Sequence, residues 1–260
     1  MKPTFESRIN QRLRSLRESG LHRRLRETSS PQGRLIQIDG RPLINFSSND
    51  YLGLANDVRI IEAAKRAAET TGAGAGASRL ISGNHRVHSE LEEAIANLKQ
   101  TEDALVFSTG YAAAIGTIPS LIGKDDVVVI DRLAHASLVD GARMSGAKLR
   151  VFRHNDPSDL ERILTWAAPR QSLIVTESVF SMDGDLAPLT DLMALADAHN
   201  AILVVDEAHA TGVFGDMGRG LSHAFADREN LLTLHTCGKG LGVSGALICG
   251  EKSAIDTLIN

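Results

Sequence analysis

The chain has 260 residues, of which 43% are hydrophobic, 23% charged and 4% aromatic, and its formal net charge is −4. This composition is typical of a globular protein with a full-sized core. No apolar run approaches the roughly 20 residues that cross a bilayer, and the negative balance gives no support to nucleic-acid binding. The two cysteines, Cys237 and Cys249, lack metal-ligand spacing, so we expect a cytoplasmic protein without a metal site.

The first 46 residues are predicted to form a helix and a hairpin. Apolar side chains recur among arginines at near-helical spacing, which indicates an amphipathic helix. These side chains are Phe5, Ile9, Leu13, Leu16 and Leu21. Two alternating segments, 34–38 and 42–46, flank Asp39-Gly40, a pair that favours a tight turn. We therefore expect an N-terminal segment over residues 1–46 and a large domain over residues 47–260.

Two helices and a glycine-rich loop are expected next. Asp57 is placed to cap a helix that runs to about Thr70, and residues 82–99 carry the pattern of a second helix. Residues 72–79 between them read GAGAGASR, which resembles a dinucleotide-binding fingerprint. That fingerprint must follow a strand, whereas this segment follows a helix. The loop is therefore predicted to be a hinge or a surface where substrate meets backbone.

From residue 104 onward, short apolar runs alternate with helical patterns. This alternation predicts an α/β fold with a mainly parallel sheet, right-handed crossovers and helices on both faces. The expected strands are residues 104–107, 126–130, 148–152, 172–176, 201–205 and 231–234, and the expected helices are residues 110 onward, 135–144, 159–167 and 189–199. Gly110 opens a helix directly after a strand, where free backbone N–H groups favour a phosphate.

The candidate site lies where two of these strands end. Residues 201–205 are continuously apolar, as in a strand buried on both faces, and Asp206 and His209 follow them. Ligands of open α/β sheets collect outside the carboxyl ends of the strands. Lys239 follows the next strand, between glycines that permit a sharp turn and a close approach to a ligand.

Two chemistries require an acid at the position of Asp206. One is magnesium-dependent nucleotide hydrolysis, and the other is pyridoxal-phosphate catalysis, in which a carboxylate keeps a pyridinium nitrogen protonated. The hydrolase hypothesis requires a GxxxxGK loop that continues with Ser or Thr. Gly-Lys pairs occur only at residues 123–124 and 238–239, and neither pair fits that pattern. The sequence therefore favours pyridoxal phosphate.

Six motifs, in order along the chain, resemble those of the α-oxoamine synthases, which are fold-type I pyridoxal-phosphate enzymes. The motifs are NFSSNDYLGL at 45–54, SRLISGN at 78–84, DRLAHAS at 131–137, FSMDGD at 180–185, DEAHATG at 206–212 and TCGK at 236–239. The resemblance covers practically the whole chain. It implies the large domain of that fold, with the N-terminal helix and hairpin before it.

The resemblance assigns roles at the cofactor. It implies that Lys239 forms the Schiff base, Asp206 pairs with the pyridinium nitrogen and His135 stacks on the ring. His209 and Ser181 are expected beside the ring's 3-oxygen. The residues implied to hold the phosphate are Gly110, Tyr111 and Thr236.

The resemblance also implies substrate contacts. Asn49, Arg23 and His135 match substrate-side positions, although Arg24 and Arg26 are equally placed for the role of Arg23. Four other histidines are expected to be structural: His85, His88, His154 and His199. One departure is Ala114, where the motif that begins at Tyr111 leads us to expect asparagine.

Within the family the motifs are most similar to the branch that condenses L-alanine with pimeloyl-CoA or a pimeloyl carrier protein, with loss of CO₂, in biotin synthesis. The resemblance implies a homodimer. Family members continue into a C-terminal domain that this chain is expected to lack, which predicts exposed apolar surface and poor solubility. Three alternatives stay open: a sister synthase that uses glycine, such as 2-amino-3-ketobutyrate ligase or 5-aminolevulinate synthase; an inactive cofactor-binding remnant; and the nucleotide hydrolase.

Overall fold

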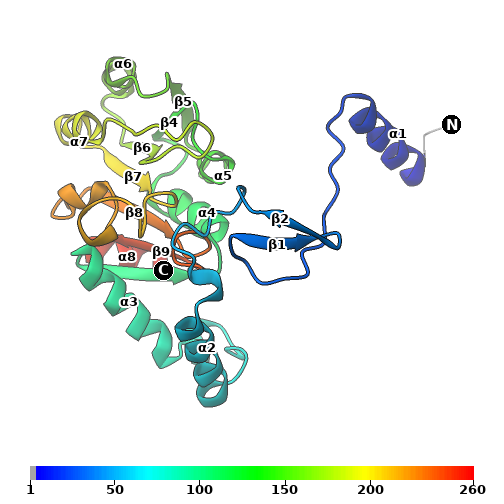
Figure 1. Cartoon of the computed structure of the whole chain (residues 1–260). Helices are drawn as coiled ribbons and strands as arrows, with labels where there is room; N and C mark the ends of the chain where they lie inside the picture. The colour runs from blue at the N-terminus through cyan, green and yellow to red at the C-terminus, as the bar shows by residue number, and fades with distance from the viewer. Residues whose placement is uncertain (1–3) are drawn as a thin grey trace. The chain divides into compact units, whose positions relative to one another are not determined.

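The structure is a computed structural model that describes residues 4–260. It divides into two compact units, with the boundary along the chain between Phe46 and Ser47. The first unit holds helix α1 (Phe5–Glu18) and an antiparallel hairpin of β1 (Leu35–Ile38) and β2 (Arg41–Ile44). Asp39 and Gly40 both have positive φ, as this two-residue turn requires. The predicted helix and hairpin are therefore confirmed (Figure 1).

The second unit is built on a seven-stranded sheet of order β3-β9-β8-β7-β6-β4-β5. Its strands are β3 (Asp103–Phe107), β4 (Val127–Asp131), β5 (Lys148–Phe152), β6 (Ser172–Glu177), β7 (Ile202–Asp206), β8 (Leu231–Thr236) and β9 (Ala246–Gly250). Neighbours from β5 through β8 are parallel, and only β9 runs against both of its neighbours. The predicted mainly parallel sheet is confirmed. Strand β9 was not predicted from the sequence.

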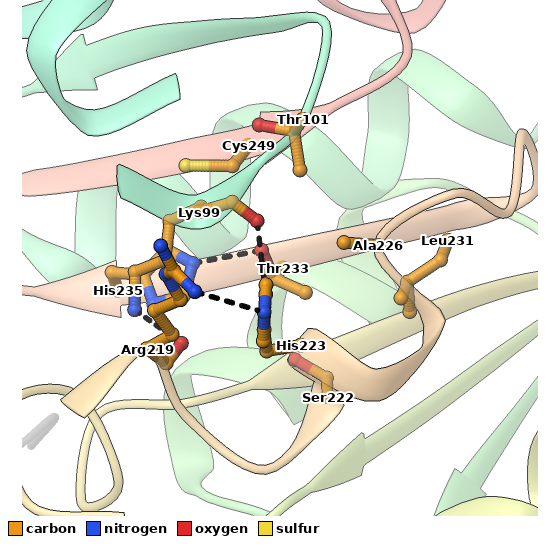
Figure 2. A pocket seen from close by; sticks show the side chains of 10 residues that line it. All are labelled: Lys99, Thr101, Arg219, Ser222, His223, Ala226, Leu231, Thr233, His235 and Cys249. Atoms are coloured by element: carbon orange, nitrogen blue, oxygen red, sulfur yellow. Dashed lines mark hydrogen bonds between the residues drawn. The ribbon is translucent and has the colours of Figure 1, made fainter. Parts of the chain in front are cut away.

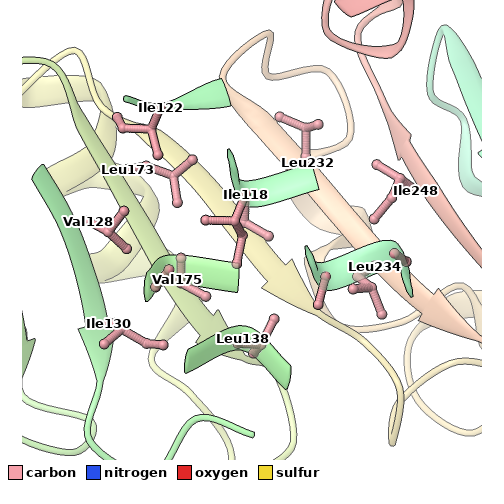
Figure 3. Close-up of a cluster of buried hydrophobic side chains, with 14 of the residues drawn as sticks. Ile118, Ile122, Val128, Ile130, Leu138, Leu173, Val175, Leu232, Leu234 and Ile248 are labelled. Atoms are coloured by element: carbon pink, nitrogen blue, oxygen red, sulfur yellow. The ribbon is translucent and has the colours of Figure 1, made fainter. Parts of the chain in front are cut away.

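Helices cover both faces of this sheet. Successive strand residues point to opposite sides, and because they are apolar on both sides, each face packs against helices. Val128 and Ile130 pack with α4 (Gly110–Leu121), α5 (Ala136–Met144) and α8 (Lys252–Ile259) in one core (Figure 3). Val127 and Val129 pack with α6 (Pro157–Ala167) and α7 (Leu189–Ala198) in the second core. All of these strand side chains are at most 1% exposed. The strands are thus anchored from both sides, which fixes the positions of their ends.

The segment before α3 differs from the prediction. Asp57 caps α2 (Val58–Thr71) as expected, but α3 (Arg86–Lys99) begins four residues later than predicted. Residues 79–83 form a π turn instead, because the Arg79 guanidinium bonds to Asn84 and to Glu92 at 2.7 Å. Short 3₁₀ turns complete the unit at Leu54–Asn56, Asp216–Gly218 and Ser222–Phe225.

A buried polar cluster joins the end of α3 to the loop after β7 (Figure 2). Lys99 is 3% exposed, and its Nζ donates to the Arg219 carbonyl at 2.7 Å. His235 on β8 bonds to Thr233 at 2.7 Å and to Thr211 at 2.8 Å, so both of its ring nitrogens are satisfied. These bonds hold the segment that follows the DEAH motif against the sheet. Within residues 4–260 no helix is long and apolar enough to cross a membrane.

Candidate active site

An open cleft of about 200 Å³ lies at the carboxyl ends of β6, β7 and β8. Its walls combine backbone at the start of α4 with titratable side chains from the sheet edge. The lining residues are Gly110, Tyr111, His135, Ser137, Glu177, Asp206, Ala208, Leu234, Thr236 and Lys239. Six of the residues predicted as cofactor ligands are therefore brought together, from segments that span about half of the chain.

Lys239 lies three residues beyond β8, and its side chain is partly buried. Its Nζ is 2.7 Å from Nε2 of His209. Burial lowers the pKa of Lys239, and this effect outweighs the attraction of the Asp206 and Glu177 carboxyls, which raise it. Burial therefore shifts Lys239 toward the neutral amine, the form that acts as a nucleophile or base.

A glycine allows the loop around Lys239 to fold tightly. Gly242 has a φ of 69°, and a Cβ at this position would lie 2.5 Å from the backbone nitrogen of Ala55. Any other residue would therefore clash with the 3₁₀ turn at Leu54–Asn56. The glycine-rich sequence beside Lys239 serves this close packing of backbone on backbone.

Lys239 is the first member of a hydrogen-bonded chain. His209 Nε2 contacts Lys239 Nζ at 2.7 Å, and its Nδ1 contacts the Tyr51 hydroxyl at 2.6 Å. The Tyr51 hydroxyl in turn donates to Oδ1 of Asn49 at 3.3 Å. Burial, followed by the charges of Lys239 and His135, lowers the pKa of His209 to about 4. These hydrogen bonds therefore hold the neutral imidazole of His209 against the Lys239 amine.

Asp206 and Glu177 end the neighbouring parallel strands β7 and β6 and lie opposite each other in the register. Asp206 is 6% exposed, and its Oδ1 accepts the Ala208 N–H at 2.9 Å. Burial is the main cause that raises the pKa of Asp206 to about 6. Burial, and then the charge of Asp206, raise the pKa of Glu177 to about 7. The floor of the cleft therefore holds two carboxyl groups of unusually high pKa.

Glu177 was not among the predicted site residues. It directly follows the expected strand 172–176, so the reasoning that selected Asp206 after the expected strand 201–205 applies to it equally. Tyr51 was also missed as a site residue, although it lies inside a quoted motif. Its contact with His209 joins residues that are 158 positions apart, and no local sequence pattern predicts such a contact.

His135 caps α5 beside the cleft. Its Nδ1 accepts the Ser137 N–H at 3.2 Å and contacts the Ser137 hydroxyl at 2.7 Å. Because Nδ1 accepts, the proton of the neutral ring is on Nε2. Burial and the nearby charge of Lys239 lower the pKa of His135. A neutral ring in the wall of the cleft can pack against a flat ligand.

The part of the cleft at the start of α4 suits an anion. Gly110 and Tyr111 begin α4, and the first N–H groups of a helix have no partner within the helix. The Thr236 hydroxyl lies 3.5 Å from the position that a Cβ on Gly110 would take. Glycine therefore leaves room between the helix start and the hydroxyl. The Tyr111 hydroxyl donates to Asp140 at 3.3 Å.

Other predicted residues are placed differently. Ser181 is exposed and is absent from the residues that line the cleft, while Arg23 belongs to the first unit, between α1 and β1. Asn49 is exposed and reaches the site through Tyr51. His154 links Asp131 and Asp185 by bonds of 2.9 and 2.7 Å, as a structural histidine does. Among the residues that the structure describes, no three acids, histidines or cysteines are grouped to hold a metal.

Comparison with known proteins identifies relatives along the whole chain. The chain is 49% identical over 254 residues to the 8-amino-7-oxononanoate synthase of Anaeromyxobacter sp. (strain Fw109-5), covering 97% of this chain and 64% of the relative. The enzyme of the same name from Geobacter sulfurreducens is 47% identical over 250 residues, with 95% and 64% covered. The chain thus spans 64% of the length of these two curated relatives.

Solved structures agree with this assignment. A serine palmitoyltransferase from S. paucimobilis with a bound PLP–myriocin aldimine superposes with a TM-score of 0.89 at 32% identity, covering 98% of this chain and 68% of that one. The 8-amino-7-oxononanoate synthase of Francisella tularensis superposes with a TM-score of 0.70 at 30% identity, covering 82% and 60%. The family model of aminotransferase class I and II matches residues 41–260. The chain therefore belongs to the aminotransferase class I and II family.

Proposed function

We propose that this chain forms the pyridoxal-phosphate site of an 8-amino-7-oxononanoate synthase, which condenses L-alanine with a pimeloyl thioester and releases CO₂. The observation that carries the proposal is the convergence of Lys239 and Asp206 on one cleft at the carboxyl edge of the sheet, with His209 bonded to Lys239 at 2.7 Å. The identity of 49% to a curated synthase of this name supports the substrate class. The acyl donor is a CoA or carrier-protein thioester, and the working enzyme is proposed to be a homodimer.

The residues of the cleft fit pyridoxal phosphate in charge and shape. The start of α4 and the Thr236 hydroxyl offer donors to a phosphate, with Gly110 and Tyr111 supplying backbone N–H groups. At the opposite end, Asp206 offers a carboxylate to a protonated ring nitrogen. Glu177 adds a buried oxygen, Oε1, that has no hydrogen-bond partner in residues 4–260. Such an unsatisfied atom is expected in a cleft shaped for a ligand.

Each residue of the site then has a stated task. The cofactor supplies an electron sink next to the amino-acid α-carbon. Lys239, whose pKa is lowered by burial, would bind the cofactor covalently and would serve as the base at that carbon. His209, whose Nε2 lies 2.7 Å from Lys239 Nζ, would hold the cofactor's oxygen, with Ser181 as a further proposed donor, and His135 would pack on the flat ring. Asn49 and Arg23 are proposed to contact substrate.

The first test is the visible absorption of the purified chain after addition of pyridoxal phosphate. We expect a band from a Schiff base in the unaltered chain and no such band in Lys239→Ala, because only a primary amine forms the bond. Lys252→Ala, which removes an exposed lysine on α8, is the matched control and is expected to keep the band. A band of equal strength in Lys239→Ala would refute the assignment of Lys239.

A second test addresses the substrates. The chain is incubated with pimeloyl-CoA and either L-alanine or glycine, and released thiol and CO₂ are measured. We expect turnover with L-alanine to exceed turnover with glycine. Preference for glycine would instead assign the chain to a sister synthase, and cofactor binding without any turnover would favour an inactive remnant.

A further inference from the structure

Glu177 is a buried acid for which the proposed reaction has no assigned task. Its side chain ends β6 and lines the cleft, and the residue is 2% exposed. Oε1 is fully buried and accepts no hydrogen bond from any described residue. A buried carboxylate normally accepts several hydrogen bonds, because leaving its charge unpaired in a low-dielectric site is costly. The arrangement is therefore poorly suited to an ionised Glu177.

The groups that face Glu177 come from several elements. Asp206 lies opposite it on β7, and Lys239 is on the loop after β8. The backbone amides of His135, before α5, and of Ser181, after β6, also lie near enough to lower its pKa. Among the described residues, no lysine, arginine or histidine forms an ion pair within 4.0 Å with Glu177 or with Asp206. Lys239, which forms no ion pair within 4.0 Å with either acid, therefore stabilises their negative charges only weakly.

Two buried carboxyl groups side by side do not ionise together, since each negative charge disfavours the other. The structure decides which of the two keeps the proton. Asp206 Oδ1 accepts the Ala208 N–H at 2.9 Å, a bond that stabilises its ionised form. Glu177 Oε1 has no donor, and the backbone amides of His135 and Ser181, which lower the pKa of Glu177, offset the effect of burial only in part. The unpaired oxygen therefore places the proton on Glu177, whose pKa is raised by burial and by the charge of Asp206.

We propose that Glu177 is a positioning residue that holds a proton at neutral pH, so that the two-acid floor of the cleft carries one negative charge, on Asp206. One charge matches the single positive charge of a protonated pyridine ring. The proton of Glu177 is in addition a hydrogen-bond donor at the edge of the cleft, next to the ionised acid. This inference rests on the proposed cofactor, but the protonation state itself is a property of the chain alone.

Infrared difference spectroscopy of the purified chain tests the protonation state without cofactor. We expect a carbonyl stretch of a protonated carboxyl group at pH 7 that shifts when glutamate is labelled with ¹³C and disappears in Glu177→Gln. Glu161→Gln, which alters an exposed acid on α6, is expected to keep the band. The isotope shift on the unaltered chain assigns the band to a glutamate even where the variant fails to fold, and Glu177 is the buried glutamate whose Oε1 accepts no hydrogen bond from the described residues. Absence of a ¹³C-sensitive band at pH 7 would overturn the proposal.

Cofactor binding supplies the second readout. Gln imitates a protonated Glu, whereas Asn at position 206 removes the negative charge. Asp206→Asn is therefore expected to weaken pyridoxal-phosphate binding at least tenfold more than Glu177→Gln does. Equal losses in the two variants would show that Glu177 also acts as an anion, against the proposal. If the unaltered chain binds no pyridoxal phosphate, the proposed function fails, and the infrared result still decides the protonation of Glu177.

Discussion

A buried acid with a raised pKa makes the stability of this protein depend on pH. The pKa of Glu177 rises from 4.5 to about 7 on folding. Between these values the folded chain keeps a proton that the unfolded chain has lost, so the free energy of unfolding falls as the pH rises from 4.5 to 7. In Glu177→Gln the side chain at position 177 cannot titrate, so the free energy of unfolding does not fall for this reason. We expect the variant to gain on the order of 2–3 kcal/mol over the unaltered chain by pH 8, and little at pH 4.5.

Urea unfolding at several pH values measures this difference. Glu161→Gln, on the exposed side of α6, is the control and is expected to change the free energy of unfolding by less than about 0.5 kcal/mol at every pH. A constant difference between Glu177→Gln and the unaltered chain across this range would contradict the raised pKa.

The tautomer of His209 is a second property set at single residues. Because the Tyr51 hydroxyl donates to Asn49 Oδ1, it accepts from His209 Nδ1, which places the ring proton on Nδ1 and leaves Nε2 to accept from Lys239. In Tyr51→Phe the acceptor for Nδ1–H is lost. We expect ¹⁵N spectra to show the Nδ1–H tautomer in the unaltered chain and a larger share of Nε2–H in this variant. Tyr111→Phe is the matched control, and an Nε2–H tautomer in the unaltered chain would refute the argument.

At the scale of elements, the sequence predicts best those helices and strands that depend on residues close together in the chain. β7 was predicted from its continuous apolar residues and α2 from its cap at Asp57, and both are confirmed. β9 was missed, although it is a short buried apolar run that begins at Ala246, soon after its antiparallel partner β8 ends at Thr236. The start of α3 was misplaced because Arg79 bonds to Glu92 across 13 residues and holds a π turn. Non-local pairing, which periodicity does not report, accounts for the error at α3, whereas β9 carries an apolar run like that of β7 and could have been predicted from it.

The Arg79–Glu92 pair also yields a prediction. Glu92 Oε1 accepts from Arg79 at 2.7 Å and from the Val106 N–H at 2.9 Å, so one carboxylate joins the π turn, α3 and β3. Glu92→Gln leaves Arg79 without its counter-charge, and we expect a loss of about 1–3 kcal/mol in the free energy of unfolding. Glu90→Gln removes the exposed pair with Arg86 and is expected to cost less than about 1 kcal/mol. Similar losses in both variants, measured by urea unfolding, would argue against the role of Glu92.

At the scale of the whole molecule, the candidate site lies at the ends of the strands that we expect to be most resistant to local unfolding. β6 and β7 are central in the sheet, are paired on both sides and carry buried side chains along almost their entire length. The β1–β2 hairpin has a single buried side chain, Ile36, and two-stranded hairpins are marginal alone. We expect amide hydrogens of β6 and β7 to exchange only through global unfolding, and those of β1 and β2 at least a hundredfold faster. Hydrogen exchange followed by mass spectrometry measures both.

The same experiment separates a rigid site from a mobile one. Glu177 and Asp206 are the last residues of β6 and β7, so slow exchange in these strands would mean that both acids are held in place before any ligand arrives. Lys239 lies beyond the end of β8, and its loop is expected to exchange faster than the strand. Exchange in β6 and β7 as fast as in the hairpin would show that the sheet does not preorganise the acids. In that case the high pKa of Glu177, which requires a persistently buried carboxyl group, would not be observed either.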